Sequence, residues 1–115
     1  MIRKPSEMRT EVRKNMRGAP GSVTIQHYFA KEDIEADVRL CARLVIPPGA
    51  GIGSHQHEKE DEIFIIQKGT GLIDDNGTQV RVSPGDAILT GKGGSHAVLN
   101  DGDADLEITA MIMCY

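Results

Sequence analysis

The chain has 115 residues, of which 39% are hydrophobic and 26% charged, a composition that is typical of one globular domain and excludes a disordered polypeptide. No apolar run approaches the ~18 residues that a membrane-spanning helix needs, and no apolar stretch near the N-terminus resembles a secretory signal. Only Cys41 and Cys114 could form a disulfide, and two cysteines favour a reducing setting. We therefore expect a cytoplasmic protein with no membrane partner.

The first twenty residues form a basic segment on an otherwise acidic chain. They carry six basic residues against two acidic ones, a balance of +4, whereas residues 21–115 carry seven against fifteen, which together give the net charge of −4. A basic segment can bind nucleic acid. This one lacks aromatic side chains for base stacking, and the acidic remainder repels phosphate, so we expect no nucleic-acid partner.

We interpret residues 1–20 as an N-terminal basic arm that docks on the acidic domain of its own chain or of a partner. Within it, Met8, Val12 and Met16 are spaced four apart, a spacing compatible with a short amphipathic helix over residues 6–17.

Strand-forming segments dominate residues 21–115. Turns rich in glycine, proline, asparagine and aspartate separate them, and Asn76-Gly77 predicts a tight hairpin. Many short strands at intervals of roughly ten residues are typical of a sandwich or barrel. The predicted strands cover residues 23–29, 37–46, 63–66, 72–74, 79–82, 87–90, 97–99 and 106–115.

Three histidines and a glutamate are candidate metal ligands: His55, His57, Glu62 and His96. His55 and His57 are two residues apart, so on a strand they point to the same side. Glu62 joins them only if the chain reverses in the polar run of residues 58–61, which we expect to be an exposed turn. His96 must arrive from a separate strand. Taken singly, each of these residues is more typical of a solvated surface than of a metal site.

The glycines around these residues resemble the first motif of the cupin superfamily. In that motif a glycine is followed by five residues, His-x-His, three or four residues, a glutamate, six residues and a second glycine. The matching residues here are Gly49, His55, His57, Glu62 and Gly69.

The second cupin motif is a glycine, five residues, Pro-x-Gly, two residues, a histidine, three residues and an asparagine. Gly85, Gly93, His96 and Asn100 match it, whereas Gly91 stands where the family usually has proline. The substitution loosens the loop before His96 and removes no ligand. Together the two motifs cover residues 49–100, about half of the chain.

The resemblance implies an all-β, single-domain double-stranded β-helix (jelly-roll) barrel over residues 21–115, preceded by the short basic arm. It implies a metal inside the barrel, bound by His55, His57, Glu62 and His96. Small cupins commonly dimerise through N-terminal strands, so we expect a homodimer, with residues 22–29 as an exchanged or edge strand.

The donor set restricts the metal. Three imidazoles and one carboxylate, without a thiolate, argue against a structural zinc site and suit manganese, iron, nickel, copper or zinc as a divalent ion. If the ion is octahedral, two positions stay open for water, a substrate or dioxygen.

Three functions remain open on this basis. The first is a metal-dependent enzyme acting on a small organic molecule, with dioxygenase, decarboxylase, lyase or isomerase chemistry among the options that the resemblance implies. The second is a non-catalytic barrel that binds or senses a small ligand through a metal anchor. The third is a structural metal site. No catalytic residue beyond the four ligands is apparent.

Phe64 and Ile66 share the parity of Glu62 and should face the interior. Arg39 and Arg43 share a face that we place outside, and His27 is interpreted as structural.

Overall fold

The computed structural model describes residues 1–115, whose regular structure consists of ten strands and three single-turn 3₁₀ helices. None of the helical turns is long enough to cross a membrane. The helical turns are η1 (Pro5–Glu7), η2 (Met16–Gly18) and η3 (Lys31–Asp33). The strands are β1 (Thr10–Lys14), β2 (Ser22–His27), β3 (Val38–Ile46), β4 (Gly51–Gln56), β5 (Glu60–Lys68), β6 (Gly71–Asp75), β7 (Thr78–Val82), β8 (Ala87–Thr90), β9 (Ser95–Leu99) and β10 (Leu106–Cys114).

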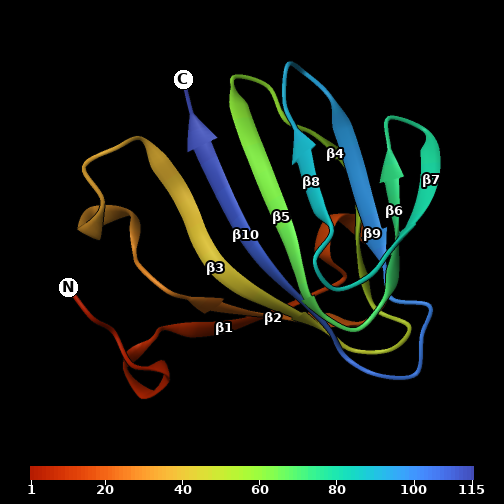
Figure 1. Cartoon of the computed structure of the whole chain (residues 1–115), viewed down its shortest axis with the longest axis horizontal. Helices are drawn as coiled ribbons and strands as arrows, with labels where there is room; N and C mark the ends of the chain where they lie inside the picture. The colour runs from red at the N-terminus through yellow and green to blue at the C-terminus, as the bar shows by residue number, and fades with distance from the viewer.

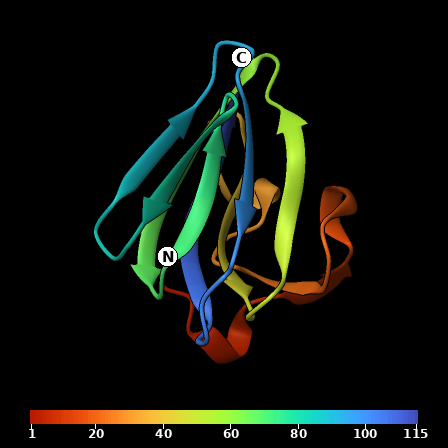
Figure 2. The same cartoon turned by 90° about the vertical axis from the view of Figure 1, so that its right-hand side faces the viewer.

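The strands form two antiparallel sheets that face each other across one core (Figures 1 and 2). The larger sheet has the order β1-β2-β3-β10-β5-β8, and the smaller one has the order β4-β9-β6-β7. No strand pairing joins the two sheets, so hydrogen bonds do not close the barrel. This is the all-β jelly-roll architecture that the motifs predict.

An aliphatic core fills the space between the sheets, because every long strand turns alternate side chains inward. On β10 the buried residues are Leu106, Ile108, Ala110 and Ile112, so the methionines of this strand lie on its outer face. Phe64, on β5, is the one aromatic ring in the core cluster. Burying one large apolar side chain stabilises the fold by about 1.5–3 kcal/mol, and this hydrophobic effect is the main force that holds the sheets together.

Most of the predicted strands are confirmed to within one or two residues at each end. The Asn-Gly hairpin is confirmed as well, with φ of 50° at Asn76 and 91° at Gly77 between β6 and β7. Positive φ at both central residues is what the twist of a two-residue hairpin requires. The carboxylate of Asp74 also accepts a hydrogen bond from the Gly77 amide at 2.7 Å, which fixes the turn.

The amphipathic helix considered for residues 6–17 is wrong. Residues 10–14 form β1, which pairs with β2 along its whole length, from Thr10 opposite Gln26 to Lys14 opposite Ser22. The side chain of Val12 is 61% exposed, so the three spaced apolar residues build no buried face. Ladder hydrogen bonds to an existing sheet outweigh the weak helical preference of such a short segment.

The expected edge position of residues 22–29 is also corrected. β2 pairs with β1 on one side and with β3 on the other, so β1 is the edge strand of the larger sheet. The homodimer itself stays a prediction.

Asn100, the last residue of the second motif, is expected to be essential for stability. It is fully buried, and its side-chain amide donates to the carbonyls of Ile46 and Ala104, both at 2.8 Å, while its oxygen accepts from the amide of Gly102 at 2.9 Å. Asn100→Ala leaves two buried carbonyls and one backbone amide without a hydrogen-bond partner. We therefore expect it to lower the free energy of unfolding by about 2–4 kcal/mol, measured by urea denaturation. The exposed Gln79→Ala is the control, and equal stability of the two variants would contradict this role.

Candidate metal centre

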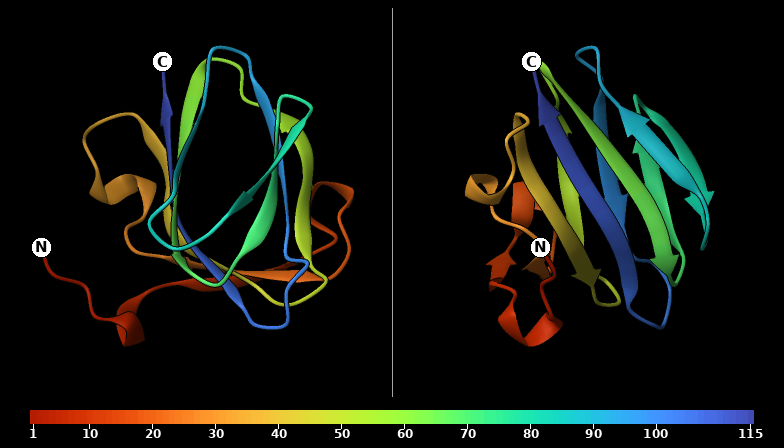
Figure 3. Two further views of the ribbon diagram at one scale, coloured as in Figure 1. Left: turned by 45° about the vertical axis from the view of Figure 1, so that its right-hand side comes forward. Right: turned by 60° about the vertical axis from the view of Figure 1, so that its left-hand side comes forward.

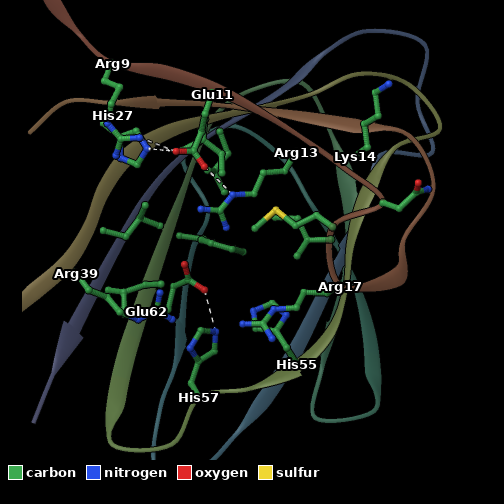
Figure 4. Close-up of a pocket in the computed structure, with 18 residues that line it drawn as sticks. Arg9, Glu11, Arg13, Lys14, Arg17, His27, Arg39, His55, His57 and Glu62 are labelled. Carbon is green, nitrogen blue, oxygen red and sulfur yellow. Dashed lines mark hydrogen bonds and ion pairs between the residues drawn. The ribbon is translucent and has the colours of Figure 1, made fainter. Parts of the chain in front are cut away.

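Four predicted ligands, His55, His57, Glu62 and His96, come together between the two sheets at one end of the barrel. His55 on β4 and His96 on β9 are directly opposite each other in the smaller sheet. Glu62 is on β5 of the larger sheet, and His57 follows the end of β4 (Figure 4). The group therefore draws its members from both sheets.

A tight turn over residues 57–59 makes this arrangement possible. β4 and β5 belong to different sheets, so the turn carries the chain from one sheet across to the other. Lys59 has a φ of 55°, and the backbone amide of His57 donates to the carbonyl of Gly94 at 2.9 Å. The exposed turn expected over residues 58–61 is thus shorter, because Glu60 and Asp61 already belong to β5.

Each histidine ring is held by its Nδ1 atom. His55 Nδ1 lies 2.7 Å from the carbonyl of Gly53, His57 Nδ1 lies 2.7 Å from Glu60 Oε1, and His96 Nδ1 lies 2.9 Å from Thr90 Oγ1. Partners of this kind fix the tautomer and leave Nε2 free to bind a metal. No sequence pattern pointed to Glu60 or Thr90 in this role, because the contact of each with its histidine depends on the folded structure.

The distances between the ligand atoms fit a single ion. Nε2 of His96 lies 3.0 Å from Nε2 of His57 and 3.0 Å from Nε2 of His55, and Glu62 Oε1 lies 2.9 Å from Nε2 of both His57 and His96. All four ligand atoms lie within 4.8 Å of one another, but His55 makes no such close approach to Glu62.

These distances match an octahedron better than a tetrahedron. With bonds of about 2.1 Å, neighbouring octahedral ligands are about 3.0 Å apart and opposite ones about 4.2 Å, whereas tetrahedral ligands are about 3.4 Å apart. The four separations of 2.9–3.0 Å would therefore suit His55, His57, Glu62 and His96 as ligands of one octahedral ion. Such an ion would have two positions left for further ligands.

Neighbouring groups favour the protonation states and ring orientations that metal binding requires. Burial lowers the pKa of His55, which favours the neutral ring that a metal requires. Arg39 forms two hydrogen bonds of 2.7 Å with Glu60, and these, with the bond to His57, lower the pKa of Glu60 to about 2 despite its burial. The ring of His96 stacks on Phe64 at 4.8 Å between centroids, which fixes its plane.

A cavity of about 620 Å³ is lined by three of the four residues, His55, His57 and Glu62 (Figure 4). The apolar part of its wall comes from the core strands, and the polar part comes largely from the N-terminal arm, whose loop after β1 lies beside β4 (Figure 3). Five cationic residues line it, against the carboxylates of Glu11 and Glu62. These cations are Arg9, Arg13, Lys14, Arg17 and Arg39.

Glu11 anchors the arm over this cavity. Its carboxylate contacts Arg13 at 2.6 Å, Arg9 at 2.7 Å and Nε2 of His27 at 3.2 Å. Burial opposes ionisation of Glu11, but the hydrogen bonds from Arg13, His27 and Arg9 outweigh it and lower its pKa to about 2. His27 thus has a structural role as expected, although the residue that it holds belongs to the arm.

The expected side-chain directions are confirmed for Phe64, Ile66 and Arg43 and in part for Arg39. Phe64 and Ile66 are buried in the core. Arg43 lies on the outer face of β3, where it contacts Gln26 and Glu107. Arg39 starts on the same face, but its guanidinium reaches round to Glu60 and borders the cavity.

The family model described as "Cupin domain" matches residues 42–113. The chain belongs to the cupin family. It is 42% identical over 113 residues to the "Oxalate-binding protein" of Thermotoga maritima, an alignment that covers 98% of this chain and 93% of the relative.

Solved cupin structures resemble the whole chain. A crystal structure from Thermotoga maritima, described as a predicted oxalate decarboxylase, is 41% identical, with a TM-score of 0.95 and full coverage of both chains. The cupin domain of Cnp3 from Schizosaccharomyces pombe is 13% identical, with a TM-score of 0.74 over 91% of this chain and 69% of that chain. The second likeness shows the fold alone.

The Glu11 anchor predicts a specific dependence of stability on pH. Because its pKa falls from 4.5 to about 2 in the folded chain, its stabilising effect is present above pH 4.5 and is lost as the pH falls toward 2. Glu11→Gln should therefore lower the melting temperature at neutral pH, and the difference from the parent should shrink below about pH 4.5. Thermal unfolding followed by circular dichroism at several pH values measures both.

Glu35→Gln is the control for this measurement, because Glu35 is exposed and forms no ion pair. A gap between parent and Glu11→Gln that stays constant down to pH 2 would show that Glu11 does not titrate in this way.

Proposed function

We propose that this cupin binds a divalent transition metal through His55, His57, Glu62 and His96, and that the metal captures a small dicarboxylate of the oxalate class. The observation that carries the proposal is the position of the four donors, which lie 2.9–3.0 Å from their neighbours and three of which line a cationic cavity. Nitrogen and oxygen donors of this kind suit manganese, iron, nickel, copper or zinc.

The nature of the ligand follows from charge and from the two open positions. Two carboxylate oxygens of one molecule can fill adjacent positions on an ion, as a small dicarboxylate does. The five cations of the cavity wall favour an anion over a neutral sugar or amine. The curated relative at 42% identity bears the name "Oxalate-binding protein", which supports the same ligand class.

Metal-centred catalysis on the bound acid is the second candidate. It is favoured by the 41% identical structure described as a predicted oxalate decarboxylase, and an octahedral ion at the site would leave two positions open for the acid. Glu11 is ionised at neutral pH because of its pKa of about 2, so it cannot donate a proton there. The residues of this chain would thus bind and orient the acid and exclude water, and the chemistry would be that of the metal.

The ligand assignment makes a graded prediction. His57→Ala should reduce metal content sharply, because it removes a donor that is only 1% exposed and is held by Glu60. Glu62→Gln should weaken binding less, because an amide oxygen still coordinates but lacks the charge. Metal content per chain is measured by inductively coupled plasma mass spectrometry. His27→Ala, a histidine outside the group, is the control, and full occupancy in His57→Ala would refute the assignment.

Metal-dependent anion binding tests the function directly. Calorimetric titration of oxalate into the manganese-loaded protein should give one site per chain. The metal-free protein should bind oxalate far more weakly, because the two oxalate oxygens that would bind the metal then have no partner. Assay of the same sample for oxalate consumption separates the two candidates. Equal affinity with and without metal would refute the proposal, and turnover would favour the enzyme.

A further inference from the structure

Arg17 stands apart from the other six arginines of this chain. Each of those six forms an ion pair, whereas no carboxylate lies within ion-pair distance of Arg17. The arginine without a partner is also one that lines the cavity above the four candidate ligands. We propose that Arg17 is the residue that selects a dianionic ligand, an inference that rests on the proposed function.

The backbone conformation of residues 15–17 brings Arg17 to the cavity. Asn15 and Arg17 have φ values of 50° and 53°, a left-handed conformation that costs free energy for residues other than glycine. The loop can adopt it because Gly53 of β4 has no side chain: a Cβ there would collide with the carbonyl of Arg17. Gly53 is also the residue whose carbonyl holds the ring of His55. One glycine therefore positions both a candidate ligand and the arm.

The side chain of Arg17 extends from the loop toward His55 (Figure 4). The other cations of the cavity are engaged or directed elsewhere. Arg9 and Arg13 share the carboxylate of Glu11, and Arg39 is paired with Glu60. Lys14 points away from the ligand group in the same view. Of the four arginines that line the cavity, Arg17 is the one with no carboxylate partner, so its guanidinium is free to bind a molecule in the cavity.

Charge balance gives this guanidinium a consequence for selectivity. A divalent ion and Glu62 carry a net charge of +1. A monocarboxylate makes the site neutral, whereas a dicarboxylate leaves it at −1, and an uncompensated charge in a partly buried site is costly. Arg17 supplies the missing positive charge, and its guanidinium can bind the two oxygens of the dicarboxylate that do not face the metal. It should therefore favour dianions over monoanions.

Two substitutions test this role. Arg17→Asn removes the charge while keeping a residue that tolerates a left-handed φ, so the variant is expected to fold. Arg17→Lys keeps the charge but loses the planar guanidinium. Arg81→Gln is the matched control, because Arg81 pairs with Asp101 outside the metal cavity. The affinities of oxalate and acetate are measured by calorimetry on the manganese-loaded proteins, together with manganese content.

Arg17→Asn should keep the manganese content of the parent but lose about 10- to 100-fold in oxalate affinity, the range expected for hydrogen bonds to a charged group. Its acetate affinity should change far less, so that the preference for the dianion falls. Arg17→Lys should recover part of the loss, and Arg81→Gln should behave as the parent.

The remaining outcomes separate the two proposals. If the parent binds manganese and oxalate and Arg17→Asn does so equally well, Arg17 has no such role, while the proposed function stands. Loss of manganese in Arg17→Asn would mean that Arg17 supports the metal site rather than the anion, and the inference would be wrong. If the loaded parent binds no oxalate, both proposals fall together.

Discussion

The structure depends on holding four candidate ligand atoms within 4.8 Å of one another between two sheets that are not hydrogen-bonded to each other. His57, Glu62 and His96 are almost fully buried, and burying polar groups costs free energy unless each finds a partner. Thr90 and Glu60 supply partners at the Nδ1 atoms of the histidines. The aliphatic core beneath keeps the two sheets at the separation that the group needs.

The same requirement explains the role of the N-terminal arm. A site at the open end of a barrel is accessible to water, and the arm narrows this opening by adding β1 to the edge of the larger sheet and laying its loop on Gly53. Five of the eight charged residues of the arm then line the cavity. Glu11 pairs with two of its arginines, and Arg17 remains unpaired. The basic composition of the arm would thus complement the proposed anionic ligand in the chain's own cavity.

Ligand binding and catalysis make different demands on such a site. Binding needs a metal with open positions and a complementary charge, and the cavity offers residues for both. Proton transfer needs a group whose pKa lies near the working pH, whereas the arginine partners of Glu11 keep its pKa at about 2. Any reaction would therefore depend on the metal and on the way in which the arm encloses the bound acid.

The sequence by itself determined the fold family, most strand positions and the four residues that converge, because the spacing of glycines and histidines along the chain reflects local turns and the alternation of side chains on strands. Tertiary structure alone decided that residues 10–14 pair as a strand, since those hydrogen bonds depend on a neighbouring strand that local propensity does not include. It also decided that Glu60 and Thr90 hold histidines, and that Arg17 faces the cavity without a partner. Thr90 and His96 lie in different sheets, and Glu60 contacts His57 only because of the turn between β4 and β5. No pattern in the sequence specifies which charged residue will lack a partner.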